Sequence, residues 1–93
     1  MLELAGKTED GKVVVKGIYR LYETSGIPLD FIFDYVFSSG LIVSWFDFHL
    51  EAQGNGMKHK RILSKLEEPV SNIWGEEYWA VVKKNLELKF GKP

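Results

Sequence analysis

The sequence predicts an all-α domain, a compact bundle of four to five short helices. Three observations indicate this fold: 93 residues suffice for one core, apolar side chains recur three and four residues apart, and glycines separate the apolar segments. Hydrophobic residues make up 45% of the chain and charged residues 27%, which is typical of an ordinary globular domain. We expect a single helical domain over residues 13–91, preceded by a flexible leader over residues 1–12.

The first helix is expected to begin at Val13 and to end at Gly26. Its apolar positions fit one helical face: Val14, Ile18, Leu21 and Tyr22. The run of three valines at residues 13–15, which lies before Gly17, could equally form a short strand over residues 13–16.

A second helix should begin at Pro28, because a proline in the first turn costs no backbone hydrogen bond. Gly40 should end it, and its buried face would comprise Leu29, Ile32, Phe33, Val36 and Phe37.

The third helix has the clearest start, because Ser44 and Asp47 can form a pair that resembles a capping box while Val43 packs on Phe48. Gly54 and Gly56 should close this helix. A fourth helix begins near Met57 or Lys58, and its apolar residues keep helical phase across Pro69, which favours one kinked helix: Ile62, Leu63, Leu66, Val70, Ile73 and Trp74.

A fifth helix should begin at Glu76 and Glu77, whose charges suit the positive end of a helix, and end before Gly91. Its buried stripe would comprise Tyr78, Val81, Val82, Leu86 and Phe90.

Several classes of function find no support in the residues. The chain has no cysteine, which excludes disulfides and thiolate zinc sites. Asp47 and His49 are too close in sequence to share a helical face, and His59 has no second histidine beside it, so we expect no metal or other cofactor. Asp30 and Asp34 lack the partners that hydrolysis requires, so we expect no enzyme.

The longest uncharged run, residues 35–46, is shorter than the roughly 20 residues of a membrane-spanning helix. The N-terminus lacks the basic start and the long apolar stretch of a secretory signal, so we expect a cytoplasmic protein without a membrane partner.

Aromatic residues are dense between Tyr22 and Phe48, and they cannot all point into one small core. The excess predicts an exposed aromatic surface that binds a protein partner or a second copy of the chain, and we expect a homo-oligomer. The first candidates for this interface are Trp45, Phe46, Trp74 and Trp79. The leading hypothesis is therefore a helical interaction module.

The alternative hypothesis is a helix-turn-helix regulator that binds DNA. Residues 45–53 would form its first helix, residues 54–56 its turn, and the segment from Met57 its second helix. The second helix would present Lys58, Arg61, Ser64 and Lys65 to the nucleic acid. A net charge of -1 and five acids with no lysine or arginine from Leu21 to Met57 count against this reading.

The runs at residues 18–30, 64–68 and 74–78, with Trp45 and Phe48 between them, resemble small helical proteins of Gram-positive phages and prophages. Pro69 departs from their pattern, since an ordinary helix former is expected there. The resemblance implies a short helical accessory protein and transfers no catalytic residue.

Overall fold

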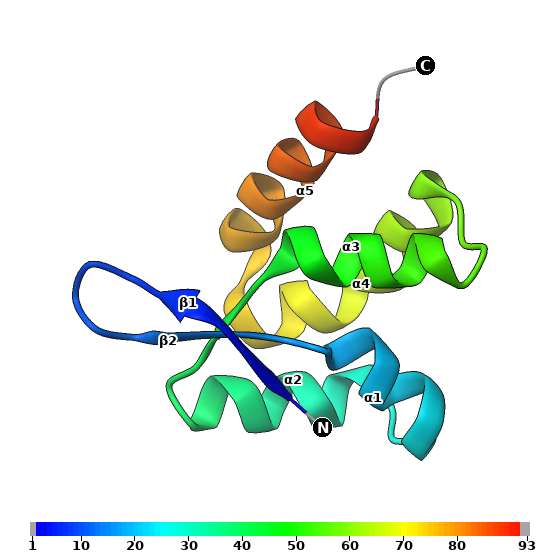
Figure 1. The fold of residues 1–93 in the computed structure, drawn as a ribbon. Coiled ribbons are helices and arrows are strands. Elements are labelled where there is room, and N and C mark those ends of the chain that lie inside the picture. The colour runs from blue at the N-terminus through cyan, green and yellow to red at the C-terminus, as the bar shows by residue number, and fades with distance from the viewer. Residues whose placement is uncertain (1, 92–93) are drawn as a thin grey trace.

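The computed structural model describes residues 2–91, which form a mostly helical domain with a small sheet (Figure 1). In chain order the elements are β1 (Glu3–Lys7), β2 (Val13–Lys16), α1 (Ile18–Ser25), α2 (Leu29–Ser38), β3 (Ile42–Val43), α3 (Trp45–Gly54), α4 (His59–Trp74) and α5 (Glu76–Phe90). The mostly helical character of the predicted fold is confirmed, whereas the all-α prediction is wrong, because residues 3–7, 13–16 and 42–43 form a small sheet.

Strand β2 is the central strand of the sheet, antiparallel to β1 and parallel to β3. Residues 13–16 are therefore the strand that the valine run allowed, and a helix that begins at Val13 is wrong. β-branched side chains fit a pleated strand, and Gly17 separates β2 from α1 with a left-handed φ of 92°.

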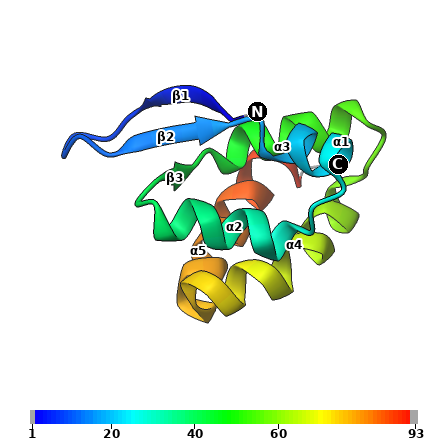
Figure 2. The ribbon, with the colours of Figure 1, turned by 90° about the horizontal axis from the view of Figure 1, so that it is seen from below.

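Strand β1 lies within the segment expected to be a leader without regular structure, so the first ordered element begins earlier than predicted. The hairpin of β1 and β2 extends past the helices at one side of the molecule, while α4 and α5 lie on the opposite side (Figure 2).

The predicted C-terminal ends of α1, α2 and α3 and the predicted starts of α2 and α3 are confirmed to within a few residues. Gly26 caps α1 with a left-handed φ of 75°, and Pro28 precedes the first residue of α2. At α3 the Ser44 hydroxyl oxygen accepts a hydrogen bond from the Asp47 N–H at 3.3 Å, and the same hydroxyl donates to the Asp47 carboxylate at 2.5 Å. The predicted cap at Ser44 is thereby confirmed.

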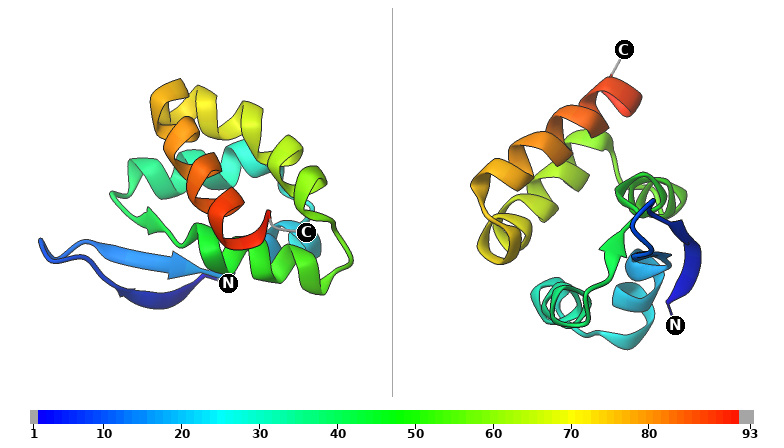
Figure 3. Two further views of the ribbon diagram at one scale, coloured as in Figure 1. Left: turned by 90° about the horizontal axis from the view of Figure 1, so that it is seen from above. Right: turned by 90° about the vertical axis from the view of Figure 1, so that its left-hand side faces the viewer.

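Helix α4 runs without interruption across Pro69, as its apolar phase predicted. Proline has no backbone N–H, so the carbonyl of Lys65 lacks its α-helical donor at this point. Gly75 alone separates α4 from α5, with a left-handed φ of 103°, and α5 turns back beside α4 (Figure 3). Val81 was placed in the buried stripe of α5 but is exposed; Trp79, Val82 and Leu86 are the buried residues.

The core is centred on Phe33 of α2, which is fully buried. Its ring lies 5.3 Å from Trp45 of α3, 5.6 Å from Trp74 of α4 and 6.1 Å from Phe48 of α3, measured between ring centroids. The tilted and edge-on geometry of these contacts is the arrangement that aromatic quadrupoles favour. Phe37, predicted to be buried with Phe33, is half exposed at the end of α2, where its ring contacts Trp74 edge-on.

We expect Phe33→Ala to lower the free energy of unfolding by about 3–5 kcal/mol, because the change leaves a cavity where three helices meet. Phe31→Ala, on the same helix but 66% exposed, should change it by less than about 1 kcal/mol. Urea unfolding followed by circular dichroism measures both. Equal effects for the two variants would show that Phe33 is not the centre of the core.

Candidate functional site

The four aromatic residues predicted for an interface do not form a joint exposed face. Trp79 is buried, and Trp45 and Trp74 are partly buried against the core, with their ring centroids 5.5 Å apart. The indole N–H of Trp45 donates to the Tyr78 hydroxyl at 3.0 Å. Phe46 is exposed, and its ring stacks on Phe90 of α5. The three tryptophans therefore serve the core in this structure.

The exposed aromatic surface lies instead on α2. Phe31 is 66% exposed and Tyr35 is 62% exposed, and the two side chains lie one helical turn apart. Together with Leu2, Leu21, Ile27 and Ile32 they line a hollow of about 410 Å³, which we call the apolar hollow. The sequence held a signal for this surface: a helix that buries Leu29, Ile32, Phe33 and Val36 must turn Phe31 and Tyr35 away from the core.

Acidic residues are exposed on the helices that line the apolar hollow, although none of them lines the hollow itself. Asp30 and Asp34 are exposed on α2 beside Phe31 and Tyr35, and Glu23 is exposed on α1. Since no lysine or arginine occurs between Leu21 and Met57, no basic side chain of that segment offsets the charge of these acids.

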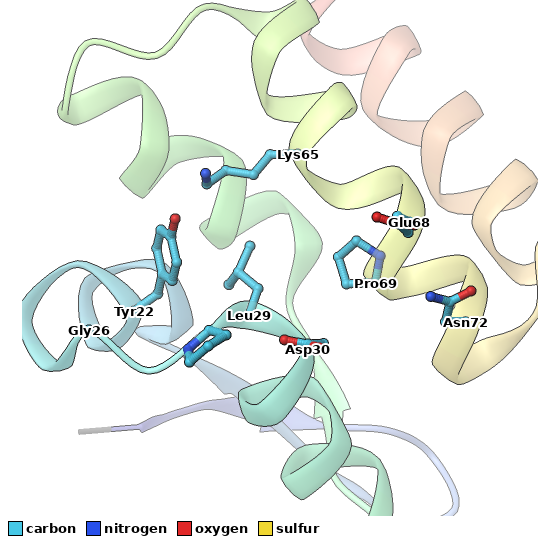
Figure 4. A pocket seen from close by; sticks show the side chains of 9 residues that line it. Tyr22, Gly26, Leu29, Asp30, Lys65, Glu68, Pro69 and Asn72 are labelled. Atoms are coloured by element: carbon cyan, nitrogen blue, oxygen red, sulfur yellow. The ribbon is translucent and has the colours of Figure 1, made fainter.

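A second, polar hollow of about 680 Å³ lies between the junction of α1 and α2 and the side of α4. The Lys65 ammonium lies 5.0 Å above the centroid of the Tyr22 ring. Figure 4 shows this cation at one end of the hollow and Glu68 and Asn72 of α4 at the other, with Asp30 across from them. Among residues 2–91, neither Asp30 nor Glu68 forms an ion pair.

The residues predicted for DNA binding differ in their exposure and direction. Lys58, the residue before α4, is exposed, as are Arg61 and Ser64 on α4, whereas Lys65 is half-buried and turned toward Tyr22. The exposed face continues along α4 into two acids, Glu67 and Glu68. A phosphate backbone that followed this face would therefore meet like charge after about two helical turns.

The fold also joins two histidines that the sequence keeps ten residues apart. His49 of α3 is fully buried, and its Nε2 lies 2.8 Å from Nδ1 of His59 at the start of α4, so one ring nitrogen donates a hydrogen bond to the other. Neither Nδ1 of His49 nor Nε2 of His59 has a partner among the described residues. We call these two side chains the imidazole pair.

The geometry of the imidazole pair suits a shared proton better than a shared metal ion. Two nitrogens that bind one tetrahedral zinc ion at about 2.0–2.1 Å lie roughly 3.3 Å apart, which is wider than the spacing found here. In the part of the chain that the structure describes, no group of three or more metal-binding side chains occurs. Burial, and then the neighbouring His59, lower the pKa of His49 below its ordinary value of 6.5.

None of the helices within residues 2–91 combines the length and the apolar character that crossing a membrane requires. No family model, no curated protein and no solved structure matches the chain. The assignment of function therefore depends on the surfaces described above.

We expect the buried His49 to make the domain sensitive to acid. Because its pKa in the folded chain is lowered, the unfolded chain takes up the proton first when the pH falls below 6.5. The free energy of unfolding should therefore hold its value above that pH and decrease below it, by at most about 1.4 kcal/mol per pH unit for this one group.

Urea unfolding at pH 7.5, 6.5 and 5.5 measures this decrease, with His49→Phe as the control variant. The free energy of unfolding of the wild-type protein minus that of His49→Phe should decrease as the pH falls, because phenylalanine cannot take up a proton. Parallel curves for the two proteins would show that His49 does not couple folding to pH.

Proposed function

We propose that the protein is a non-enzymatic interaction module whose α2 surface binds a partner segment that carries apolar side chains beside lysine or arginine. A single observation supports this function most directly: Phe31 and Tyr35 are exposed together beside an apolar hollow, and Asp30 and Asp34 are exposed on the same helix. Such a role agrees with the accessory function that the resemblance to phage and prophage proteins implies.

The apolar part of the proposed interface is the hollow between β1, α1 and α2. Exposed apolar patches of this kind mark interaction sites in soluble proteins, and aromatic side chains commonly supply most of the binding free energy. Ile27, next to Phe31 in the lining, is also exposed. An apolar side chain of the partner would enter the hollow and remove these residues from water.

The charge of the surface indicates which charged residues the partner segment should carry. Asp30 and Asp34 are exposed on α2 next in sequence to Phe31 and Tyr35, so basic residues at the flanks of a bound segment would be attracted and acidic ones repelled. The polar hollow offers a second anchor, because Asp30, Glu68 and Asn72 supply acceptors for the donors of an arginine side chain. Glu68 and Asn72 lie one turn apart on α4, so they approach such a side chain from one direction.

The same charges argue against a second copy of the chain as the occupant. A two-fold dimer through this surface would be isologous and would bring Asp30 and Asp34 of both copies to one interface. Like charges placed together at an interface cost free energy, so we propose a different protein. DNA is disfavoured on this surface for the same reason.

We expect a designed amphipathic helix of about 20 residues, with leucines on one face and arginines at the borders of that face, to bind the protein. The double variant Phe31→Ala/Tyr35→Ala should bind this peptide at least about tenfold more weakly, because it removes the two exposed rings. Fluorescence anisotropy of the labelled peptide measures the dissociation constant. The matched control is Val81→Ala/Leu88→Ala, which removes two exposed apolar side chains of α5.

Equal weakening by both double variants would overturn the assignment to α2. Light scattering on a size column completes the test. A dimer that dissociates in the Phe31→Ala/Tyr35→Ala variant would show that a second copy of the chain, and not a different protein, binds this surface. Retention of a DNA duplex that depends on Lys58 and Arg61 would support the DNA-binding hypothesis instead.

A further inference from the structure

The last turn of α5 is held on the domain by a stack of rings that includes the imidazole pair. Phe90 lies parallel to the His49 ring at a centroid distance of 3.8 Å and an interplanar angle of 5°, and its ring also stacks on Phe46 at 5.4 Å. His59 lies against His49 with 5.1 Å between ring centroids. This stack joins the start of α4, the middle of α3 and the end of α5, away from the proposed binding surface on α2.

The hydrogen bond within the imidazole pair limits how many protons the closed stack can hold. In the neutral pair, one of the two facing nitrogens carries the hydrogen and the other accepts it. One added proton places a positive charge in a buried site and leaves both outer N–H groups without acceptors among residues 2–91. A second added proton would put hydrogens on both facing nitrogens, which are only 2.8 Å apart, so the two rings would have to separate.

The groups around the pair offer little to stabilise that charge. On α4, Lys58 and Lys60 flank His59, and the positive end of the helix dipole lies at the same position. On α5, the Lys89 ammonium lies 5.2 Å from the Phe46 ring centroid, and the Glu87 backbone carbonyl accepts a hydrogen bond from the Gly91 N–H.

On α3 the Gln53 side chain favours the charged form of His49, but more weakly than burial and His59 oppose it, and Glu51 accepts a hydrogen bond from the Gly17 N–H. Neither imidazole forms an ion pair with a carboxylate in the described chain. Acid therefore adds charge to a site whose charged neighbours are mainly basic.

We propose that the imidazole pair is an acid-sensitive latch, which in its neutral form holds the last turn of α5 against α3 and which opens when it is protonated. Opening separates Phe90 from His49 and exposes the apolar faces of Phe46 and Phe90. The remainder of α5 stays in place, because Trp79, Val82 and Leu86 anchor it in the core independently of the two histidines.

Amide hydrogen exchange followed by NMR at pH 7.5 and pH 5.0 tests the latch, after the rates are corrected for the intrinsic effect of pH. We expect the amides of Phe90 and Gly91 to lose at least about tenfold of their protection at pH 5.0, while those of Leu66 and Val70 in α4 keep theirs. The imidazole ¹⁵N shifts of the same sample report protonation directly, so the wild-type protein alone can decide the outcome.

Loss of protection over the pH range in which both imidazoles protonate supports the latch. Protonation without loss of protection, or equal loss across the whole domain, overturns it. In His49→Phe, which keeps a flat ring against Phe90, protection of the last turn should be the same at both pH values. Neither result alters the peptide-binding test, because the latch and the α2 surface share no residue.

Discussion

The arrangement of the helices depends on the burial of Phe33 among Trp45, Phe48 and Trp74. These contacts fix α2 against both α3 and α4, and they use the aromatic residues with the largest apolar area in the chain. Because Trp45 and Trp74 enclose Phe33, they are partly withdrawn from the surface. In this short chain the core thus contains aromatic residues that could lie at a binding surface in a larger domain.

The orientation of α2 in the core determines which of its side chains are exposed. A helix that directs Phe33 and Val36 inward must direct Phe31 and Tyr35 outward, so the exposed rings are a geometric consequence of the core. The proposed binding surface and the aromatic core are therefore opposite faces of one helix. A change that rotated α2 would alter both at once, whereas the imidazole pair depends on α3, α4 and α5 and should respond separately.

Much of the helical structure was predictable because its signals are local. The Ser44 cap, the glycine after α1 and the constant apolar phase across Pro69 act within a few residues of the helices they define. The sheet was missed because pairing is not local: β3 has only two residues and gains its structure from β2. The face of α2 could have been found from helical periodicity. The contact between His49 and His59 could not, because only the packing of α3 against α4 brings them together.

The parallel pairing of β2 with β3 has a consequence for the order in which the chain can fold. The hairpin of β1 and β2 forms between neighbouring segments, but its other edge stays open until α1 and α2 have been placed and β3 has returned alongside it. During synthesis the first strands emerge from the ribosome with an unpaired edge, which only a later part of the same chain can cover. Strands β1 and β2 are thus made before the helices that follow them, yet the sheet is complete only when β3 pairs with β2, and α1 and α2 together form the crossover between these two strands.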